Sequence, residues 1–363
     1  MNRLFLIGDI HLGLGYPNNV DKWLNIHKKY FDDFLFPFLE KNVTDGDAII
    51  TLGDFFDNRN YVPINILNYG VKIVDRLSHI APLHMIIGNH DLWTKTASGE
   101  NSVNIMRYIN NVNIYDATKI LDFCGKKLLM MPFIEKRLDQ IKAIDDNNQC
   151  DYLFCHSDLN GARMHLSNIL QNNPDKIDID NFAKFQHVYS GHIHIRQESK
   201  NFSFVGSIFQ MDINDMDNQK GITILDVNTG KSEFIKNDIS PVFKKIVIKT
   251  DDDIQQLQQI GQTKDYIDVS ISNNMLISDK KVRRKIEEVL ENGNFAKIDF
   301  VDDVLQTDDD ANEEILLEST DKPMDYDKFT LDYIKNQPYD DIFKEKIIDE
   351  FNKIIKIYKS NDL

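Results

Sequence analysis

The sequence predicts an α/β protein, because short apolar runs typical of buried strands alternate with helical patterns through its first half. These runs lead into segments in which Asp, Asn or His stands next to a glycine or another small residue. In layered α/β proteins the loops after the strand ends are where ligands bind. The predicted strands of this part comprise residues 4–8, 48–52, 83–87, 152–155 and 187–190.

Two helices are predicted between the first three of these strands. Residues 23–40 carry apolar side chains at spacings of three and four, and Pro37 should kink or end that helix. Residues 64–77 show a second helical pattern. From residue 201 to residue 235 short strands and turns replace helices, with a hairpin turn predicted at residues 228–230.

A second, smaller unit follows, with the order of a β-α-β-α-β domain. Its predicted helices comprise residues 254–260 and 279–290, the latter with Ser278 as its N-cap. Its predicted strands comprise residues 243–249, 266–271 and 295–300.

The last part of the chain is predicted to be an acidic linker and a helical tail. Residues 302–327 hold eleven acidic side chains and one basic one, which favours a solvated linker, with an acidic partner-binding segment as the alternative. Residues 340–358 form an amphipathic pattern that would pack either on the same chain or on a partner. The predicted divisions are a di-metal phosphoesterase domain (1–240), a capping domain (241–301), the linker (302–327) and the tail (328–363).

Composition limits the classes of protein that fit. The chain has 363 residues and a net charge of −16, which argues against a surface that binds nucleic acid unaided. A partner that supplies basic surface would remove this objection. No apolar run is long enough to span a membrane. Three cysteines and no evident secretory signal predict a reducing, cytoplasmic setting.

Five short motifs carry the chemistry, and each follows a predicted strand. They are Asp9-Ile-His11, Gly53-Asp54, Gly88-Asn89-His90-Asp91, Cys155-His156-Ser157 and Gly191-His192-Ile-His194. Divalent ions need several ligands that converge from different loops, and this mixed nitrogen and oxygen set suits Mn²⁺, Fe or Zn²⁺ better than Ca²⁺. The predicted metal ligands are Asp9, His11, Asp54, Asn89, His156, His192 and His194.

Two metal ions in such a site would catalyse hydrolysis of a phosphate ester. His90, beside the ligand Asn89, is the candidate general acid for the leaving alkoxide. Asp91 could orient a site histidine or could serve only the turn. The histidines outside the motifs are interpreted as ordinary structural residues: His27, His79, His84, His165 and His187. Six residues near the motif loops could contact phosphate, although for each one an ordinary surface position is the favoured interpretation: Arg59, Asn60, Tyr61, Lys95, Arg163 and Arg196.

These motifs resemble the calcineurin-like metallophosphoesterase superfamily over roughly residues 1–225. Leu12-Gly13, Phe55-Phe56-Asp57 and Ile195-Arg196-Gln197 are similar to the SbcD-type DNA repair exonucleases, and the chain looks most like the phage recombination endonuclease subunit of that group. The resemblance implies a four-layer α/β/β/α sandwich with a small α/β capping domain and a C-terminal helical tail. It also implies a catalytic role for Asp57, at a position where some members carry His.

The resemblance further implies DNA exonuclease and endonuclease activity with two divalent ions, Mn²⁺ in preference to Mg²⁺. It implies an SMC/ABC-type, SbcC-like ATPase partner bound through the C-terminal helix, a homodimer, and the host cytoplasm as the setting of a phage-encoded protein. The alternative functions are a phosphatase or cyclic-nucleotide phosphodiesterase with the same site, or a scaffold that recruits an ATPase.

Overall fold

The computed structural model describes part of the chain in detail. The described residues are 2–15, 20–94, 100–165, 168–169, 173–248, 266–272 and 295–301, together with Lys344, Ile348 and Phe351. The chain divides into two units, Met1–Asp303 and Val304–Leu363. In the second unit Lys344, Ile348 and Phe351 are helical, while the predicted acidic linker and the rest of the predicted tail helix lie outside the described residues.

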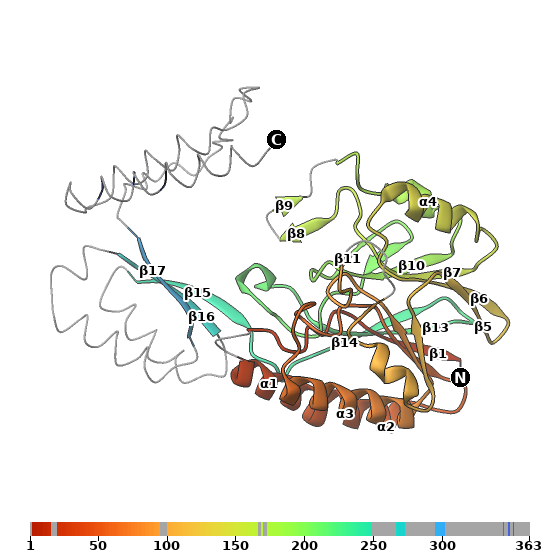
Figure 1. Cartoon of the computed structure of the whole chain (residues 1–363), viewed down its shortest axis with the longest axis horizontal. Coiled ribbons are helices and arrows are strands. Elements are labelled where there is room, and N and C mark those ends of the chain that lie inside the picture. Colours follow the sequence, from red (N-terminus) through yellow and green to blue (C-terminus); the bar gives the residue numbers. More distant parts are fainter. Residues whose placement is uncertain are drawn as a thin grey trace. The chain divides into compact units, whose positions relative to one another are not determined.

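The first sheet carries the strands predicted near the N-terminus (Figure 1). β1 (Arg3–Ile7) pairs in parallel with β2 (Ala48–Thr51), which is followed by β3 (Leu83–Ile86) and β4 (Val112–Tyr115), also parallel. On its other side β1 pairs antiparallel with β13 (Gly221–Asp226), and β13 forms a hairpin with β14 (Ser232–Lys236). The order is β14-β13-β1-β2-β3-β4.

The second sheet has the order β11-β12-β10-β7-β6-β5. Its centre is parallel, because β7 (Tyr152–His156) lies between β6 (Lys126–Met131) and β10 (His187–Gly191). The outer strands are β12 (Phe202–Phe204), which is parallel to β10, and the antiparallel edge strands β5 (Lys119–Phe123) and β11 (Gln197–Ser199). A small two-stranded ladder joins β8 (Arg163–His165) and β9 (Asn168–Ile169).

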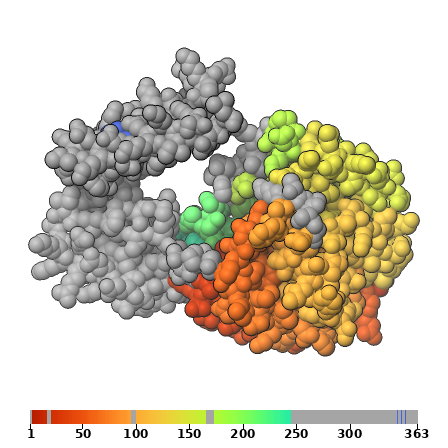
Figure 2. Space-filling view, in the orientation of Figure 1, coloured from red at the N-terminus to blue at the C-terminus, as the bar shows by residue number. Residues whose placement is uncertain are grey.

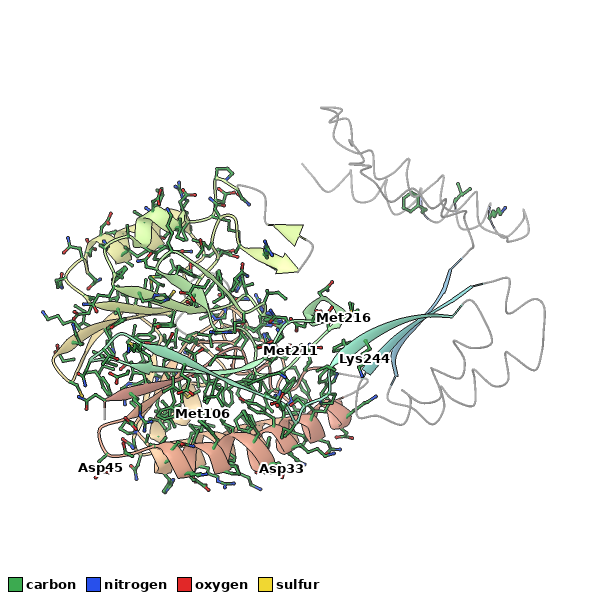
Figure 3. All side chains as sticks on the ribbon, turned by 180° about the vertical axis from the view of Figure 1, so that it is seen from behind. Asp33, Asp45, Met106, Met211, Met216 and Lys244 are labelled. Carbon is green, nitrogen blue, oxygen red and sulfur yellow. The ribbon has the colours of Figure 1, made fainter. Side chains whose placement is uncertain are left out.

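Three hydrophobic clusters show how the layers pack. One cluster lies between the two sheets and joins Leu6 and Ile50 to Met130 and Phe154. A second packs the first sheet against α1 (Val20–Lys29), α2 (Phe36–Asn42), α3 (Ile64–Ile80) and the short η2 (Asn104–Tyr108), where Met106 is buried (Figure 3). The third packs the second sheet against α4 (Arg137–Asp145) and η3 (Ile179–Phe182). The predicted α/β fold is therefore confirmed, with helical elements on the outer faces of two packed sheets.

The helix predicted at residues 23–40 is interrupted earlier than Pro37 suggests. A π-helical segment, η1 (Tyr30–Leu35), separates α1 from α2, and Pro37 stands in the first turn of α2. At that position the missing N–H of proline removes no hydrogen bond that a helix start would make. The break in the helix that the sequence predicted at Pro37 is therefore made by the π-helical segment before it.

Beyond β14 the chain enters the third sheet. β15 (Phe243–Ile248), β16 (Tyr266–Ser272) and β17 (Phe295–Val301) pair in parallel, which confirms the three strands predicted there, while the predicted helices lie outside the described residues. β15 contacts η4 (Ile213–Asp215), in the region of Met211, Met216 and Lys244 (Figure 3). In the described part of the chain no helix combines the length and apolar character needed to cross a membrane.

Candidate metal centre

The predicted ligands meet where the parallel strands of both sheets end. Asp9 follows β1, Asp54 follows β2 and Asn89 follows β3, while His156 ends β7 and His192 follows β10. Because neighbouring parallel strands end on the same side of a sheet, these side chains converge although they lie far apart in the sequence. The structure thus brings all seven predicted ligands together, with His90 and Asp57 beside them.

The backbone at the centre adopts conformations that ordinary residues rarely take. His11, Asp54 and His192 have φ values of 48°, 51° and 84°, in the left-handed region. Such strain persists where the surrounding structure holds the residue in place, and it is concentrated at functional sites. Gly88 is required for another reason, because a Cβ there would lie 2.1 Å from Oδ1 of Asp54.

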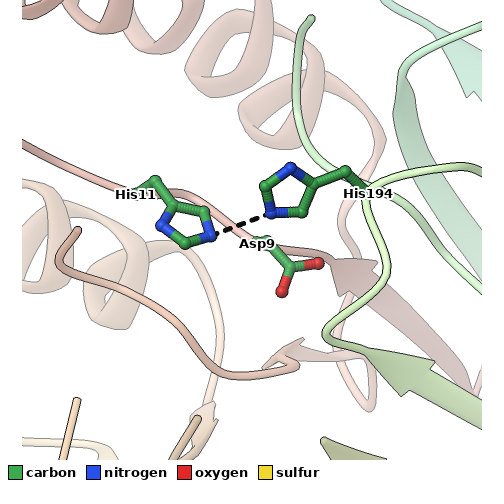
Figure 4. A group of neighbouring side chains, drawn as sticks. All are labelled: Asp9, His11 and His194. Carbon is green, nitrogen blue, oxygen red and sulfur yellow. Dashed lines mark hydrogen bonds between the residues drawn. The ribbon is translucent and has the colours of Figure 1, made fainter. Parts of the chain in front are cut away.

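The ligand atoms form two groups, the first of which we call site A. Site A consists of Asp9, His11, Asp54 and His194. The Nε2 atoms of His11 and His194 face each other at 3.0 Å (Figure 4), and Nε2 of His11 lies 3.7 Å from Oδ2 of Asp54. Oδ1 of Asp9 accepts a hydrogen bond from the backbone N–H of His192, while its buried Oδ2 has no partner among the described residues.

The second group, which we call site B, consists of Asp54, Asn89, His156 and His192. Oδ1 of Asn89 lies 2.9 Å from Nε2 of His156 and 2.8 Å from Nδ1 of His192. Nε2 of His156 is 3.3 Å from Oδ2 of Asp54. The same carboxylate oxygen of Asp54 therefore faces a histidine of each site, which makes Asp54 the link between them.

Hydrogen bonds to the outer nitrogens fix which nitrogen of each histidine faces the centre. Asp57 accepts from Nδ1 of His11 at 3.0 Å, and the Leu52 carbonyl accepts from Nδ1 of His156 at 2.7 Å. Asp158 accepts from Nε2 of His192 at 2.9 Å. Because each outer nitrogen donates, the other nitrogen keeps a lone pair for a metal ion once it has lost its own proton.

Two of these histidines hold a proton tightly. Burial by itself would lower the pKa of His11, but its hydrogen bond to Asp57 and the charges of Asp54 and Asp9 raise it to about 9. Burial would likewise lower the pKa of His156, and the charge of Asp54 raises it to about 9. The pKa of His194 lies well below its ordinary value, because it is buried and faces the positive charge of His11.

The donor set fits two divalent cations. Within each site the structure gathers a buried carboxylate and histidine nitrogens that face one another, and one histidine of each site holds a proton at the centre that a cation would displace. The buried, unpartnered Oδ2 of Asp9 is an acceptor that a cation would satisfy. Nitrogen and oxygen ligands in this proportion suit a borderline ion such as Mn²⁺, Fe²⁺ or Zn²⁺.

Comparison with known proteins agrees with this geometry. The family model of calcineurin-like phosphoesterases matches residues 3–196, more than half of the chain. The chain belongs to the calcineurin-like phosphoesterase family. The resemblance drawn from the five motifs is thereby confirmed, and the chain is a phosphoester hydrolase by family.

Among similar curated proteins is "Exonuclease subunit 1" of Enterobacteria phage T4, 26% identical over 239 residues, which are 65% of this chain and 68% of that protein. Another is "Putative phosphoesterase 244L" of Invertebrate iridescent virus 6, 26% identical over 57% of this chain and 70% of that protein. A crystal structure of a protein of unknown function from Aquifex aeolicus aligns with 43% of this chain and 80% of its own, at 22% identity and a TM-score of 0.27.

His90 lies against site A of this phosphoesterase. Its ring centroid is 4.8 Å from that of His11, and its backbone N–H donates to Oδ1 of Asp54 at 2.8 Å. Nδ1 of His90 lies 2.5 Å from the carbonyl oxygen of Asp57, which can only accept, so Nδ1 donates. Nε2 of His90 is then the nitrogen left to hold or release a proton. Asp57 thus touches both histidines, one through its carboxylate and one through its carbonyl.

Asp91 does not orient a histidine, contrary to one of the two interpretations of its motif. Its carboxylate accepts hydrogen bonds from the backbone N–H groups of Gly88, Phe55 and Phe56 at 2.9, 3.0 and 3.3 Å. Burial and the charge of Asp54 raise its pKa to about 7, although the hydrogen bonds from Gly88 and Phe56 act to lower it. Asp91 therefore ties the loop after β3 to the loop after β2, the structural role that was the alternative.

Three residues near the centre were missed by the sequence interpretation. Asp158 orients His192 and also forms an ion pair with Lys176. Lys220 is buried and donates to the carbonyl oxygen of His194 at 2.5 Å and to Asp215 at 2.6 Å. Phe133 lies beside His156 and His192. The spacing His156-x-Asp158, which mirrors Asp9-x-His11, was an available signal for Asp158, whereas Lys220 and Phe133 stand in no motif.

The residues proposed as phosphate contacts differ in their exposure and in their contacts. The guanidinium of Arg196 donates to Thr223 and lies over the ring of Phe234, which are structural contacts. Asn60, Tyr61 and Arg163 are exposed, Arg59 is partly exposed, and Lys95 lies outside the described residues.

The structural interpretation of four histidines outside the motifs is confirmed. His27 faces the carbonyl oxygens of Trp23 and Ile10, His84 the hydroxyl of Tyr115, and His187 that of Ser203, while His79 is exposed. The side chain of His165 lies outside the described residues.

Proposed function

We propose that this phosphoesterase is the nuclease subunit of a DNA break-processing and recombination complex, and that it hydrolyses phosphodiester bonds as an exonuclease and endonuclease with two Mn²⁺ ions. The observation that carries the proposal is the pair of ligand groups joined by Asp54. A pair of ions suits a reaction in which negative charge develops on both the attacking and the leaving oxygen.

The side chains have distinct roles in this proposal. Divalent ions held by sites A and B would lower the pKa of a water nucleophile and stabilise charge on the phosphoryl oxygens. His90 delivers the proton from Nε2 to the leaving oxygen, because Nδ1 is engaged by the Asp57 carbonyl. The carboxylate of Asp57 keeps Nε2 of His11 directed at site A, and Asp158 keeps Nδ1 of His192 directed at site B.

DNA is proposed as the substrate on two grounds. The phage T4 relative, which matches about two thirds of either chain, is called an exonuclease subunit. The motif segments beyond the ligands, such as Leu12-Gly13 and Phe55-Phe56-Asp57, are similar to DNA repair exonucleases. The net charge of −16 then calls for a partner that supplies basic surface, because neutralised phosphates dominate affinity for DNA.

The proposed partners are an SMC-type ATPase bound through residues 328–363 and a second copy of this chain. Exposed hydrophobic side chains near the loops of the metal centre and on η2 support a protein interface in this region. They are Tyr61, Ile64, Trp93, Ile105 and Tyr108. A phage-encoded chain would act in the host cytoplasm.

The direct test is cleavage of end-labelled double-stranded and single-stranded DNA by the full chain with Mn²⁺, with and without the ATPase of the same genome. We expect Mn²⁺-dependent products that disappear with EDTA and increase with the ATPase. Hydrolysis of p-nitrophenyl phosphate or cyclic nucleotides without any cleavage of DNA, in a protein shown to contain metal, would contradict the proposal and favour a phosphatase or cyclic-nucleotide phosphodiesterase.

A further inference from the structure

Phe133 is an aromatic side chain that stands against two ligands of site B. Its ring centroid lies 5.9 Å from that of His192 and 6.2 Å from that of His156, with the planes tilted by 31° and 74°. The four residues before Pro132, residues 128–131 of β6, are fully buried, whereas Phe133 is partly exposed. The apolar strand β6 is therefore followed by one aromatic ring at the metal centre.

The ring of Phe133 is not part of the packing that holds the sheets together. Among the described residues it belongs to none of the three hydrophobic clusters, although its neighbour Ile134 packs on the cluster behind the second sheet. Its backbone N–H donates to the carbonyl oxygen of Ile87 at 2.8 Å, which fixes the segment next to the Gly88-Asn89 loop. The backbone thus places a partly exposed aromatic residue beside site B.

Phe133 and His90 lie beside different ligand groups of the metal centre. His90 lies beside His11 of site A, and Phe133 lies beside His192 and His156 of site B. A phosphodiester has a leaving ester oxygen, which needs the proton of His90, and a second ester oxygen, whose group stays on phosphorus. A phosphate monoester has only the first, so the two substrate classes differ in the group that stays on phosphorus, and Phe133, which lies beside site B and not beside the leaving-group donor His90, is placed to contact that group.

We propose that Phe133 stacks on the base of the nucleoside that stays on the scissile phosphorus, so that the centre selects nucleoside phosphodiesters over diesters with a small alkyl group. This inference rests on the proposed phosphodiesterase function and adds its specificity. Stacking of a base on an aromatic side chain is tolerant of base identity. Loss of one such contact corresponds to roughly 5- to 150-fold in kcat/KM.

The test compares two diesters with the same leaving group, thymidine 5′-(p-nitrophenyl phosphate) and methyl p-nitrophenyl phosphate, on the Mn²⁺-loaded full chain. We expect the wild type to prefer the thymidine ester and Phe133→Ala to reduce that ratio of kcat/KM values by about tenfold, while Phe133→Trp restores it. The matched control is Phe123→Ala, at the far end of the β5–β6 hairpin and packed between the sheets, which should keep the ratio.

A binding measurement gives a second readout that does not depend on turnover. Calorimetric titration with thymidine 5′-monophosphate should show weaker binding to Phe133→Ala than to the wild type, while methyl phosphate should bind both alike. A ratio and a nucleotide affinity unchanged in Phe133→Ala would overturn the inference and leave the diesterase function standing. A wild type that hydrolyses p-nitrophenyl phosphate but neither diester would instead contradict the proposed function itself.

Discussion

Site A and site B use the same kinds of ligand but differ in the hydrogen-bond partners that the protein gives those ligands. In site B both histidines have outer partners, the Leu52 carbonyl and Asp158, and Asn89 lies within hydrogen-bond distance of both. In site A Asp57 is the outer partner of His11, the Nε2 atoms of His11 and His194 face each other across 3.0 Å, and Oδ2 of Asp9 is buried without a partner among the described residues. Site B is therefore preorganised by the fold, whereas site A needs a cation to satisfy its buried groups.

The difference has a chemical counterpart, because His90, the proposed proton donor, stands beside site A. His90 and the carboxylate of Asp57 both lie next to His11, whereas Phe133 and Asp158 lie next to His192. We infer that site A serves the chemical step, whereas site B holds an ion and one side of the substrate.

The largest expected effect comes from the residue that both sites share. In Asp54→Asn one neutral oxygen cannot serve two ions, so hydrolysis should fall to background and both ions should be lost. The comparison variant Asp9→Asn removes an anionic ligand of site A alone and should leave site B loaded. Metal content after dialysis, measured by mass spectrometry, distinguishes the two variants, and equal loss in both would show that the sites are not separable.

His90→Asn should have the next largest effect, a reduction in kcat of roughly 10²- to 10⁴-fold, the usual contribution of a general acid. Metal content should be unchanged, because the amide keeps a polar side chain beside site A without replacing a ligand. His79→Asn is the matched control, since His79 is exposed on α3. Loss of metal from His90→Asn, or full activity, would refute the role of His90 as proton donor.

Asp158→Asn should weaken Mn²⁺ binding by roughly 10- to 100-fold, the usual effect of removing the partner that orients a ligand histidine. The loss should be confined to site B, and Asp57→Asn should produce the corresponding loss at site A. Paramagnetic resonance of Mn²⁺ added in steps reports the order in which the sites fill. Filling of site A before site B in the wild type would contradict the conclusion that site B is the preorganised site.

The last prediction is a dependence of metal affinity on pH. Because the pKa values of His11 and His156 are raised to about 9, both carry a proton at pH 7, and a bound ion must displace it. Affinity should therefore increase as pH rises and level off above about 9. Calorimetry in buffers of different ionisation enthalpy should detect released protons, and binding without proton release would contradict these protonation states.

Much of the site could be predicted from the sequence because its ligands follow strands that are easy to recognise. The apolar runs that became β1, β2, β3, β7 and β10 are fully buried or nearly so, and the motif residues come directly after them. The pairing of motifs into sites A and B depends on the order of strands in two sheets, which one sequence does not reveal.

Other features left little or no sequence signal. α4 carries no apolar stripe and β5 is mostly exposed, so neither shows the pattern of a buried element. Lys220 reaches the carbonyl of His194 from another loop, and that contact exists only in the folded chain. For Asp91 the sequence left two roles open, and the folded loops decide for the structural one, because its carboxylate accepts from three backbone N–H groups.

The central claim is that two ligand groups joined by Asp54 hold two ions at one reaction centre. Anomalous X-ray diffraction from crystals of the Mn²⁺-loaded protein, recorded at the manganese edge, tests it most directly. We expect two peaks about 3.5–4 Å apart, one among the ligands of site A and one among those of site B, with Asp54 between them. A single peak, or two peaks that do not both contact Asp54, would contradict the account.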